Sequence, residues 1–382
     1  MHHRVGRVVI HASSLHAFSE MGAIYSTEGW SGMLTSPIRV TGMIAMVIVQ
    51  LITLFSHAIF RRYAFELFYY THFLYVAFVI VVVVHAKVSV YFILPGLLMH
   101  YTDKLFRFYL SRHQLKEAHL TGHKVLPCNA VRLTIQPFAS TTNGSTTTKK
   151  FSFEPGQYVF LCVPAVSAIQ WHPFSISSAG DRPNQSFDLH IKGCGNWSVA
   201  LQKAIVDSRK PRTPLKVLIE GPYGGPVIEQ WEDANVAIFI AGGIGITPFI
   251  SILTALSKKL ERHAPICLQR LHLIWVIRHE EQYTWFGKEL LALHQRLEKL
   301  PDQFTLRLDV FVTQPIQELA PSFYRGRPDL RQILPKALSR AKGNVRIGIC
   351  GPKPMVNEAA DISSRLRRKD LFISTHIEHF DI

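Results

Sequence analysis

Two histidines in a long apolar stretch are the residues of this chain best placed for redox chemistry. His72 and His85 lie thirteen positions apart within residues 61–85, a run long and apolar enough to cross a bilayer. In a helix this separation corresponds to about 20 Å along the axis. Ionisable side chains within a spanning helix are costly and usually functional. The spacing therefore favours two ligand positions at different depths of one membrane helix.

A second pair, His3 and His16, repeats the same interval near the start of the sequence. Histidine is an established axial ligand of haem iron. Two helices that each present histidines at two depths would hold two stacked haems, each iron bound from both sides. The alternative is that any one ring is an ordinary packed and hydrogen-bonded histidine, since the chain has 19 of them.

Three motifs in the second part of the chain are typical of flavin and nucleotide binding. Residues 171–178 (WHPFSISS) offer hydroxyls and backbone donors to a flavin and its phosphates. Residues 242–248 (GGIGITP) lie between a strand and a helix, where a diphosphate can approach the backbone and the helix N-terminus favours its charge. Residues 350–355 (CGPKPM) end another strand and face the crevice of such a sheet. Each alone fits an ordinary turn, so their order and spacing together carry the interpretation.

The composition divides the 382 residues into three expected domains. Residues 1–112 are strongly apolar and predict a transmembrane α-helical bis-haem domain, with four spans at about 3–19, 38–60, 64–86 and 88–110. Residues 113–230 show short strands separated by turns, which predicts a small antiparallel β-barrel. Residues 231–382 alternate apolar strands with helical patterns, which predicts a doubly wound α/β nucleotide-binding domain.

The net charge of +15 is concentrated in part beside the membrane segments. No basic run interleaved with aromatic residues is present, so nucleic acid is excluded as the expected partner. The five cysteines show no paired spacing, which fits a reducing compartment. By the positive-inside rule, the flanking basic residues place their ends of the spans in the cytosol: Arg61, Arg62, Lys104, Arg107 and Arg112.

The loop after His16 carries no Lys or Arg and is therefore expected outside. This topology places His3 and His72 near the inner face and His16 and His85 near the outer face. Because the sequence starts almost at His3, we expect a truncated membrane domain that lacks upstream helices.

The order HPFSISS, GPYG, AGGIGITPF and CGPKPM resembles the ferredoxin–NADP reductase-like dehydrogenases. Behind an apolar segment with paired histidines, it is similar to the ferric reductase and NADPH oxidase superfamily. RRYAFELFYYTHFLY, LPGLLMHYTDKLFRFYLSR and QWHPFSISS most resemble plant-type ferric-chelate reductases. LIWVIR and the later Trp285-Phe286 resemble the NADPH oxidases too.

The resemblance implies a set of cofactor contacts, with FAD in the barrel and NADPH in the α/β domain. The residues implied at the flavin and its phosphates are His172, Pro173, Phe174, Ser175, Ile176, Ser177, His190, Ile191, Lys192, Gly195, Asn196, Trp197 and Ser198. Those implied at the dinucleotide are Gly242, Gly243, Gly245, Ile246, Thr247, Pro248, Gly351 and Pro352, with Arg278 at the 2′-phosphate. Cys350 is implied at the nicotinamide and Phe380 over the flavin as catalytic residues. His3, His16, His72 and His85 are the implied ligands of haem iron.

The resemblance implies transmembrane electron transfer from cytosolic NADPH through FAD and two b-type haems to an external acceptor. A ferric or cupric chelate is the favoured acceptor, in a metalloreductase of the plasma membrane. Reduction of O₂ to superoxide is the alternative. A truncated flavin diaphorase without haem, or an inactive fragment, is the third. Expected partners are the acceptor, the lipid bilayer, and a homo-oligomer or full-length homologue.

Overall fold

The computed structural model describes residues 2–114, 116–137, 151–168, 170–180, 185–207, 215–225, 228–264, 266–298, 304–339, 341–366 and 370–378. It divides into two compact units, Met1–Leu110 and Ser111–Ile382. The predicted Phe380 lies outside the described residues, and so does the side chain of His3.

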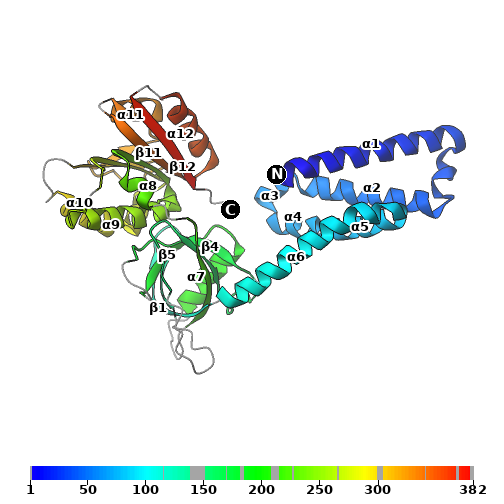
Figure 1. Ribbon diagram of the computed structural model, residues 1–382, viewed down its shortest axis with the longest axis horizontal. Helices are drawn as coiled ribbons and strands as arrows, with labels where there is room; N and C mark the ends of the chain where they lie inside the picture. The colour runs from blue at the N-terminus through cyan, green and yellow to red at the C-terminus, as the bar shows by residue number, and fades with distance from the viewer. Residues whose placement is uncertain are drawn as a thin grey trace. The chain divides into compact units, whose positions relative to one another are not determined.

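The described residues of the first unit form helices joined by short turns (Figure 1). The elements are α1 (His2–Glu28), η1 (Trp30–Leu34), α2 (Pro37–Phe55), α3 (Ala58–Tyr63), α4 (Phe65–His72), α5 (Leu74–His85), η2 (Lys87–Ser89) and α6 (Val90–Gln114). Helix α2 packs against α1, α4 and α5. It is therefore the element through which this unit is held together.

Two helical stretches of the described chain are long and apolar enough to cross a membrane. They are Pro37–Phe55 and Phe65–His85, with mean hydropathies of 2.0 and 2.2. The segments predicted at 3–19 and 88–110 form α1 and α6, but neither meets the same limits of apolarity and charge. Two of the four predicted spans therefore have a matching apolar helix, and the number of four is not confirmed.

The first unit buries very few side chains within itself. Among its described residues, Gly32, Met33, Ala45 and Val49 are buried. Large apolar side chains such as Leu15 and Ile80 are 74% and 60% exposed. Helices that are apolar around much of their circumference suit a lipid environment rather than a protein core.

The second unit begins with a six-stranded antiparallel sheet (Figure 1). Its strands are β1 (Lys116–Leu126), β2 (Ala130–Pro137), β3 (Tyr158–Cys162), β4 (His172–Ser175), β5 (Phe187–Lys192) and β6 (Lys216–Tyr223), in the order β4-β3-β6-β1-β2-β5. A bridge between Ile176 and Leu189 brings the two edge strands together. Helix α7 (Asn196–Asp207) packs Leu201 and Ile205 into the core of this sheet.

The second sheet is parallel, with six strands in the order β10-β9-β8-β7-β11-β12. Its elements are α8 (Ile228–Glu232), β7 (Val236–Gly242), η3 (Gly243–Ile246), α9 (Thr247–Glu261), β8 (Arg270–Ile277), η4 (Glu280–Trp285), α10 (Gly287–Leu297), β9 (Thr305–Val312), β10 (Phe323–Arg325), α11 (Leu330–Leu338), β11 (Gly343–Cys350), α12 (Lys353–Arg365) and β12 (Leu371–Glu378).

Both faces of this sheet are covered by helices (Figure 1). Phe239 of β7 joins the apolar cluster that includes α9 and α10. Its neighbour Ile238 joins the cluster that includes α11 and α12. Side chains alternate between the faces of a strand, so a continuous apolar run is required where both faces are buried. This explains why VAIFIAG is apolar throughout.

The connections of the sheet reverse direction between β7 and β11. From β7 the chain builds outward through β8, β9 and β10, and then returns to place β11 and β12 on the other side of β7. Open α/β sheets bind ligands at the carboxyl ends of the strands where the order reverses. The crevice expected from this topology lies at the ends of β7 and β11.

Candidate functional site

Two glycine-containing loops meet at the reversal point of the parallel sheet. Ala241 of β7 pairs with Cys350 of β11. A Cβ atom on Gly245 would lie 2.7 Å from the carbonyl oxygen of Cys350 and 3.0 Å from its sulfur. Such contacts leave no room for a side chain, so glycine is needed for the loops to approach. The structure thus brings the GGIGITP and CGPKPM motifs together.

The first loop is fixed from the sheet side by a tryptophan. The indole Nε1 of Trp275 donates to the carbonyl oxygen of Gly243 at 2.9 Å. Farther along, the Thr247 hydroxyl donates to the Ile244 carbonyl at 3.0 Å, and Ile246, Thr247 and Pro248 are buried at the start of α9. This pre-formed turn before a helix N-terminus is suited to hold a diphosphate.

Cys350 is fully buried and lies between two neighbouring strands. It pairs with Glu378 of β12 as well as with Ala241 of β7. Burial, reinforced by the carboxylate of Glu378, raises the pKa of the Cys350 thiol far above its usual range. The thiol therefore stays protonated at neutral pH and is unsuited to act as a nucleophile. Glu378 accepts a 2.7 Å hydrogen bond from the His376 ring.

Arg278 follows the end of β8 and is exposed. Its backbone is held on both sides. The amide donates to Gln282 Oε1 at 2.7 Å, and its carbonyl accepts from the Gln314 amide at 2.8 Å. Among the described residues its guanidinium has no bonding partner. A fixed backbone with an unengaged guanidinium at the ligand edge of the sheet is suited to bind a phosphate.

On the antiparallel sheet, the HPFS segment forms β4 and lies beneath an indole. The His172 ring lies 4.2 Å from the Trp197 ring, and the Phe174 ring stacks against Trp197 at 6.0 Å. His172 Nε2 and Trp197 Nε1 are buried without a hydrogen-bond partner within the described chain. Burial lowers the pKa of His172. Unpaired buried polar atoms are costly, so this pair fits a site completed by a polar ligand such as a flavin.

The loop before α7 is held by a serine in the first turn of that helix. The Ser198 hydroxyl oxygen accepts hydrogen bonds from the amides of Cys194 and Gly195, each at 3.0 Å. Gly195 and Asn196 are exposed beside the helix N-terminus. Helix N-termini favour negative charge. The structure therefore places the predicted residues 195–198 together at the start of α7, and their contact with a phosphate stays a prediction.

Three residues predicted to contact the flavin have side chains that are already packed in the core or hydrogen-bonded within the protein. Ile176 and Ile191 belong to the core of the antiparallel sheet. The Ser177 hydroxyl donates to the Asp188 carbonyl at 2.9 Å and accepts from His190 Nδ1 at 2.8 Å. Any contact of these isoleucines with a cofactor phosphate would have to come from the backbone. The remaining predicted residues of these strands are Pro173, which is exposed, and Ser175, which is buried, with Lys192 at intermediate exposure.

His190 lies at a junction between the two sheets of this unit. Its ring packs 4.2 Å from Phe286, which precedes α10. Nearby, Arg132 of β2 donates to Asp188 at 2.7 Å and to Glu289 of α10 at 3.2 Å. Trp285 Nε1 also donates to the Pro127 carbonyl at 2.9 Å. A contact between two rings, an ion pair and a hydrogen bond to a backbone carbonyl therefore join the two halves at one place.

In the helical unit, His85 is oriented by the first turn of α2. Its Nδ1 lies 3.0 Å from the carbonyl oxygen of Ile38 and 3.2 Å from the hydroxyl of Thr41. A carbonyl only accepts, so Nδ1 carries the proton and Nε2 keeps a lone pair. A Cβ on Gly42 would lie 2.9 Å from the ring, so glycine makes room for the histidine. This tautomer is the one that binds a metal through Nε2.

His72 ends α4 and rests against the other end of α2. Its Nδ1 lies 3.5 Å from the Ser56 hydroxyl, and its ring lies 5.4 Å from the Phe68 ring. His16 is exposed on α1, and His3 lies in the first turn of the same helix. At His85 and His72 one ring nitrogen is held by a partner on or at the end of α2, and the ligand role of all four histidines stays a prediction.

The sequence analysis did not single out several residues that the structure places at these sites. They are Glu378 beside Cys350, Ile38 and Thr41 behind His85, Tyr158 of β3 opposite Ser175 of β4, and Tyr223 of β6 opposite Tyr158. The common signal is their position opposite a motif on a neighbouring element. That position depends on pairing between distant segments, which motif spacing does not report.

Three family models match successive parts of the chain. A ferric reductase-like transmembrane component covers residues 1–83, an FAD-binding domain covers 121–227, and a ferric reductase NAD-binding domain covers 234–322. These matches confirm the predicted FAD- and NADPH-binding modules and the flavoprotein class. Haem is a cofactor of the same family, as predicted.

Curated relatives include both types of enzyme named above. Ferric reduction oxidase 8, mitochondrial, from Arabidopsis thaliana is 31% identical over 75% of this chain and 37% of its own length. NADPH oxidase 1 from Mus musculus is 26% identical over 73% of this chain and 52% of its own length. The chain thus spans about half or less of these relatives.

A solved structure supports the fold of the second unit. The CS-b5R domains of human Ncb5or, in the NAD⁺ form, align with a TM-score of 0.51 and 17% identity. The alignment covers 68% of this chain and 69% of that one.

The buried His190 should make the second unit sensitive to acid. Burial, reinforced by Arg132, lowers the pKa of His190 from 6.5 to about 3. The unfolded chain takes up the proton near the ordinary pKa whereas the native state does not, so stability is lost as the pH falls below about 6.5. Between about pH 7 and about pH 5 the loss should be about 2 kcal/mol.

The substitution His190→Asn keeps a donor toward Ser177 and removes the titration. The free energy of unfolding is measured by denaturant titration of the full chain in detergent at both pH values. In His190→Asn it should fall by about 2 kcal/mol less between pH 7 and pH 5 than in the unaltered chain. His123→Asn, at an exposed histidine of β1, is the matched control and should leave the pH dependence as it was. An unchanged pH dependence in His190→Asn would contradict the assignment of the buried neutral ring.

Proposed function

Because the chain belongs to the superfamily of ferric reductases and NADPH oxidases, we propose that it moves electrons across a membrane. The proposed route runs from NADPH through FAD and two b-type haems to an acceptor on the opposite side. The observation that carries the membrane part is the tautomer of His85. Its Nδ1–H faces the Ile38 carbonyl, which leaves Nε2 available to iron.

The bound cofactors would supply the redox chemistry: NADPH a hydride, FAD the change from two electrons to one, and haem single-electron transfer. The protein's part is to bind and orient. The loops 242–248 and 350–352 would hold the dinucleotide, with Arg278 at the 2′-phosphate and Cys350 near the nicotinamide. The segment 172–177 and the loop 195–198 would hold FAD, with the antiparallel strands closed as a barrel and Phe380 over the flavin.

The histidines would form two levels within the membrane. His3 and His72 would bind the inner haem, and His16 and His85 the outer one. The basic residues beside the spans support a cytosolic position for the flavin and nucleotide domains. We place the protein in the plasma membrane, because the proposed acceptor lies outside the cell.

For the acceptor, we favour a ferric chelate. Support comes from ferric reduction oxidase 8, which is 31% identical over 75% of this chain, whereas NADPH oxidase 4 from Rattus norvegicus reaches the same identity over 57%. Reduction of O₂ to superoxide is the second candidate, because NADPH oxidase 1 matches a similar share of the chain. A flavin diaphorase without haem is the third, since α1, the helix that carries both His3 and His16, does not meet the criteria of a membrane span.

The test uses the full chain in sealed vesicles with NADPH supplied at the flavin side. Ferric-chelate reduction and superoxide release are measured in parallel on the opposite side. A chelate rate well above the superoxide rate is expected. A dominant superoxide yield would replace the reductase by the oxidase, and flavin reduction without haem reduction would leave only the diaphorase.

Arg278→Ala should separate the two nicotinamide nucleotides. Loss of a charge-assisted contact with the 2′-phosphate should raise KM for NADPH about ten-fold or more while leaving KM for NADH nearly unchanged. Steady-state flavin reduction with both nucleotides measures this. Arg262→Ala, at the far end of α9, is the matched control and should change neither. Equal effects on both nucleotides would remove Arg278 from the phosphate site.

His85→Ala should remove one haem and spare the flavin. Without the imidazole, iron at that level loses one axial ligand, so the haem-to-flavin ratio should fall by about half. The reduced absorbance spectrum and FAD content of the purified chain measure it. His57→Ala, an exposed histidine before α3, is the control and should retain both. Loss of FAD together with haem would argue against the ligand assignment.

A further inference from the structure

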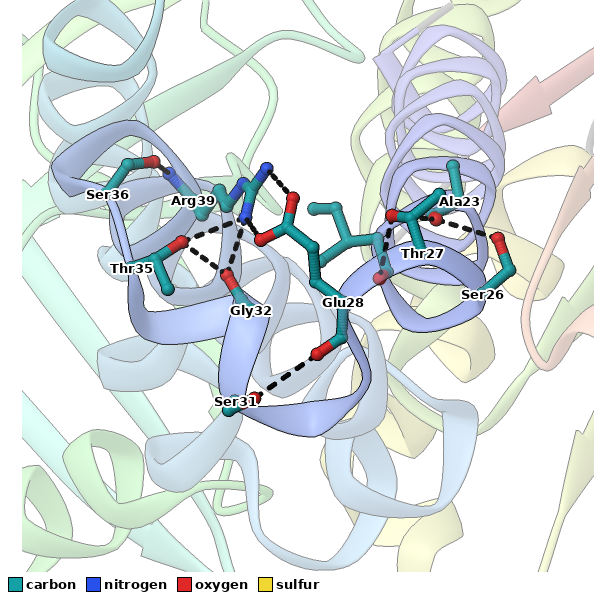
Figure 2. Close-up of polar contacts among 10 residues, drawn as sticks. Ala23, Ser26, Thr27, Glu28, Ser31, Gly32, Thr35, Ser36 and Arg39 are labelled. Carbon is teal, nitrogen blue, oxygen red and sulfur yellow. Dashed lines mark hydrogen bonds and ion pairs between the residues drawn. The ribbon is translucent and has the colours of Figure 1, made fainter.

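The loop between α1 and α2 is closed by one arginine (Figure 2). The two terminal nitrogens of Arg39 donate to the two carboxylate oxygens of Glu28, at 2.6 and 2.8 Å. This fork geometry is specific to arginine and makes both a charge contact and an orientation. Glu28 is the last residue of α1 and Arg39 lies in the first turn of α2, so the pair joins the two helix ends.

The same guanidinium also holds the interior of the loop. One terminal nitrogen donates to the Gly32 carbonyl at 2.8 Å and to the Thr35 hydroxyl at 2.9 Å. The Arg39 amide donates to the Ser36 hydroxyl, which caps the start of α2 (Figure 2). Both terminal nitrogens are thus engaged within the loop. The first turn of α2 is tied to α1 through this one side chain.

That turn is the surface on which His85 rests. Ile38, the residue before Arg39, provides the carbonyl that accepts from His85 Nδ1, and Thr41 provides the hydroxyl. Thr41 itself donates to the Pro37 and Ile38 carbonyls, at 3.0 and 2.8 Å. The contacts of Arg39 with the loop and the contacts of His85 with Ile38 and Thr41 therefore share the single turn 37–41. A shift of that turn moves the acceptor of the histidine N–H.

We infer that the Glu28–Arg39 pair is a positioning device for the outer haem, acting through the turn that orients His85. The inference rests on the proposed function, since it needs His85 to bind iron. Partners beyond the ligand set ring orientation and ligand basicity, and so tune the metal. Arg39 and Glu28 have 28% and 43% of their side chains exposed. Their pairing is therefore open to solvent ions, and added salt should weaken it.

The test compares the full chain with three variants. Glu28→Gln removes the charge at constant shape, Arg39→Lys keeps the charge and loses the fork, and Thr41→Val removes the hydroxyl beside the ring. Glu20→Gln, at an exposed glutamate of the same helix, is the matched control. Each protein is purified with its haem and examined by redox titration and by electron paramagnetic resonance of the ferric haems.

We expect the midpoint potential and resonance signal of one haem to shift in all three variants, while the other haem stays as in the unaltered chain. Retention of that one haem should fall by up to about ten-fold. The double variant Glu28→Gln/Thr41→Val should shift no further than the larger single one, because both act through one ring. FAD content and flavin reduction by NADPH should stay constant and show that the proteins are folded.

Two failures are distinguishable. An unaltered chain that carries FAD but no haem overturns the proposed function, and this inference with it. If the unaltered chain carries two haems, the positioning role is tested separately. Haem potentials and resonance signals in Glu28→Gln and Arg39→Lys that equal those in the control Glu20→Gln overturn that role alone. A shift of both haems together would also overturn it, because a general loosening of the helices does not act on one ligand.

Discussion

The proposed nucleotide site depends on a contact that only glycine permits. The backbone at Gly245 lies so close to Cys350 that a single added carbon would overlap the carbonyl oxygen. This approach brings the ends of β7 and β11 together at the point where the strand order reverses, the position at which open α/β sheets bind ligands. A wider separation would leave two unrelated turns. The two loops meet because the sheet pairs their strands and the glycine leaves room for the approach.

Much of this site could be predicted from the sequence, since its signals are local. A glycine-rich turn between a buried strand and a helix reports its own conformation. The partners of those motifs could not be predicted in the same way. Glu378 reaches Cys350 through strand pairing, and His190 is directed against Phe286 across a junction between two sheets. Both positions depend on packing between segments far apart in the chain.

The helical unit shows the same division between local and distant signals. His72 and His85 lie in one continuous segment, and the apolar composition of that segment indicates that it crosses a membrane. The acceptors behind the rings lie on α2, and no local pattern marks the Ile38 carbonyl as special. The count of four spans was the weaker expectation, because α1 and α6 mix apolar residues with polar and charged ones. Hydropathy alone does not decide whether such helices cross a membrane.

The junction around Arg132 limits how this protein family can be recombined. Arg132 bridges Asp188 on the flavin side and Glu289 on the nucleotide side, while Trp285 donates to the Pro127 carbonyl. A substitution on one side therefore alters the contacts made by the other side, so these positions should vary together among homologues. A chimera that exchanges only the nucleotide-binding half between relatives would inherit a mismatched seam. Exchanging the two halves as one cassette would preserve it.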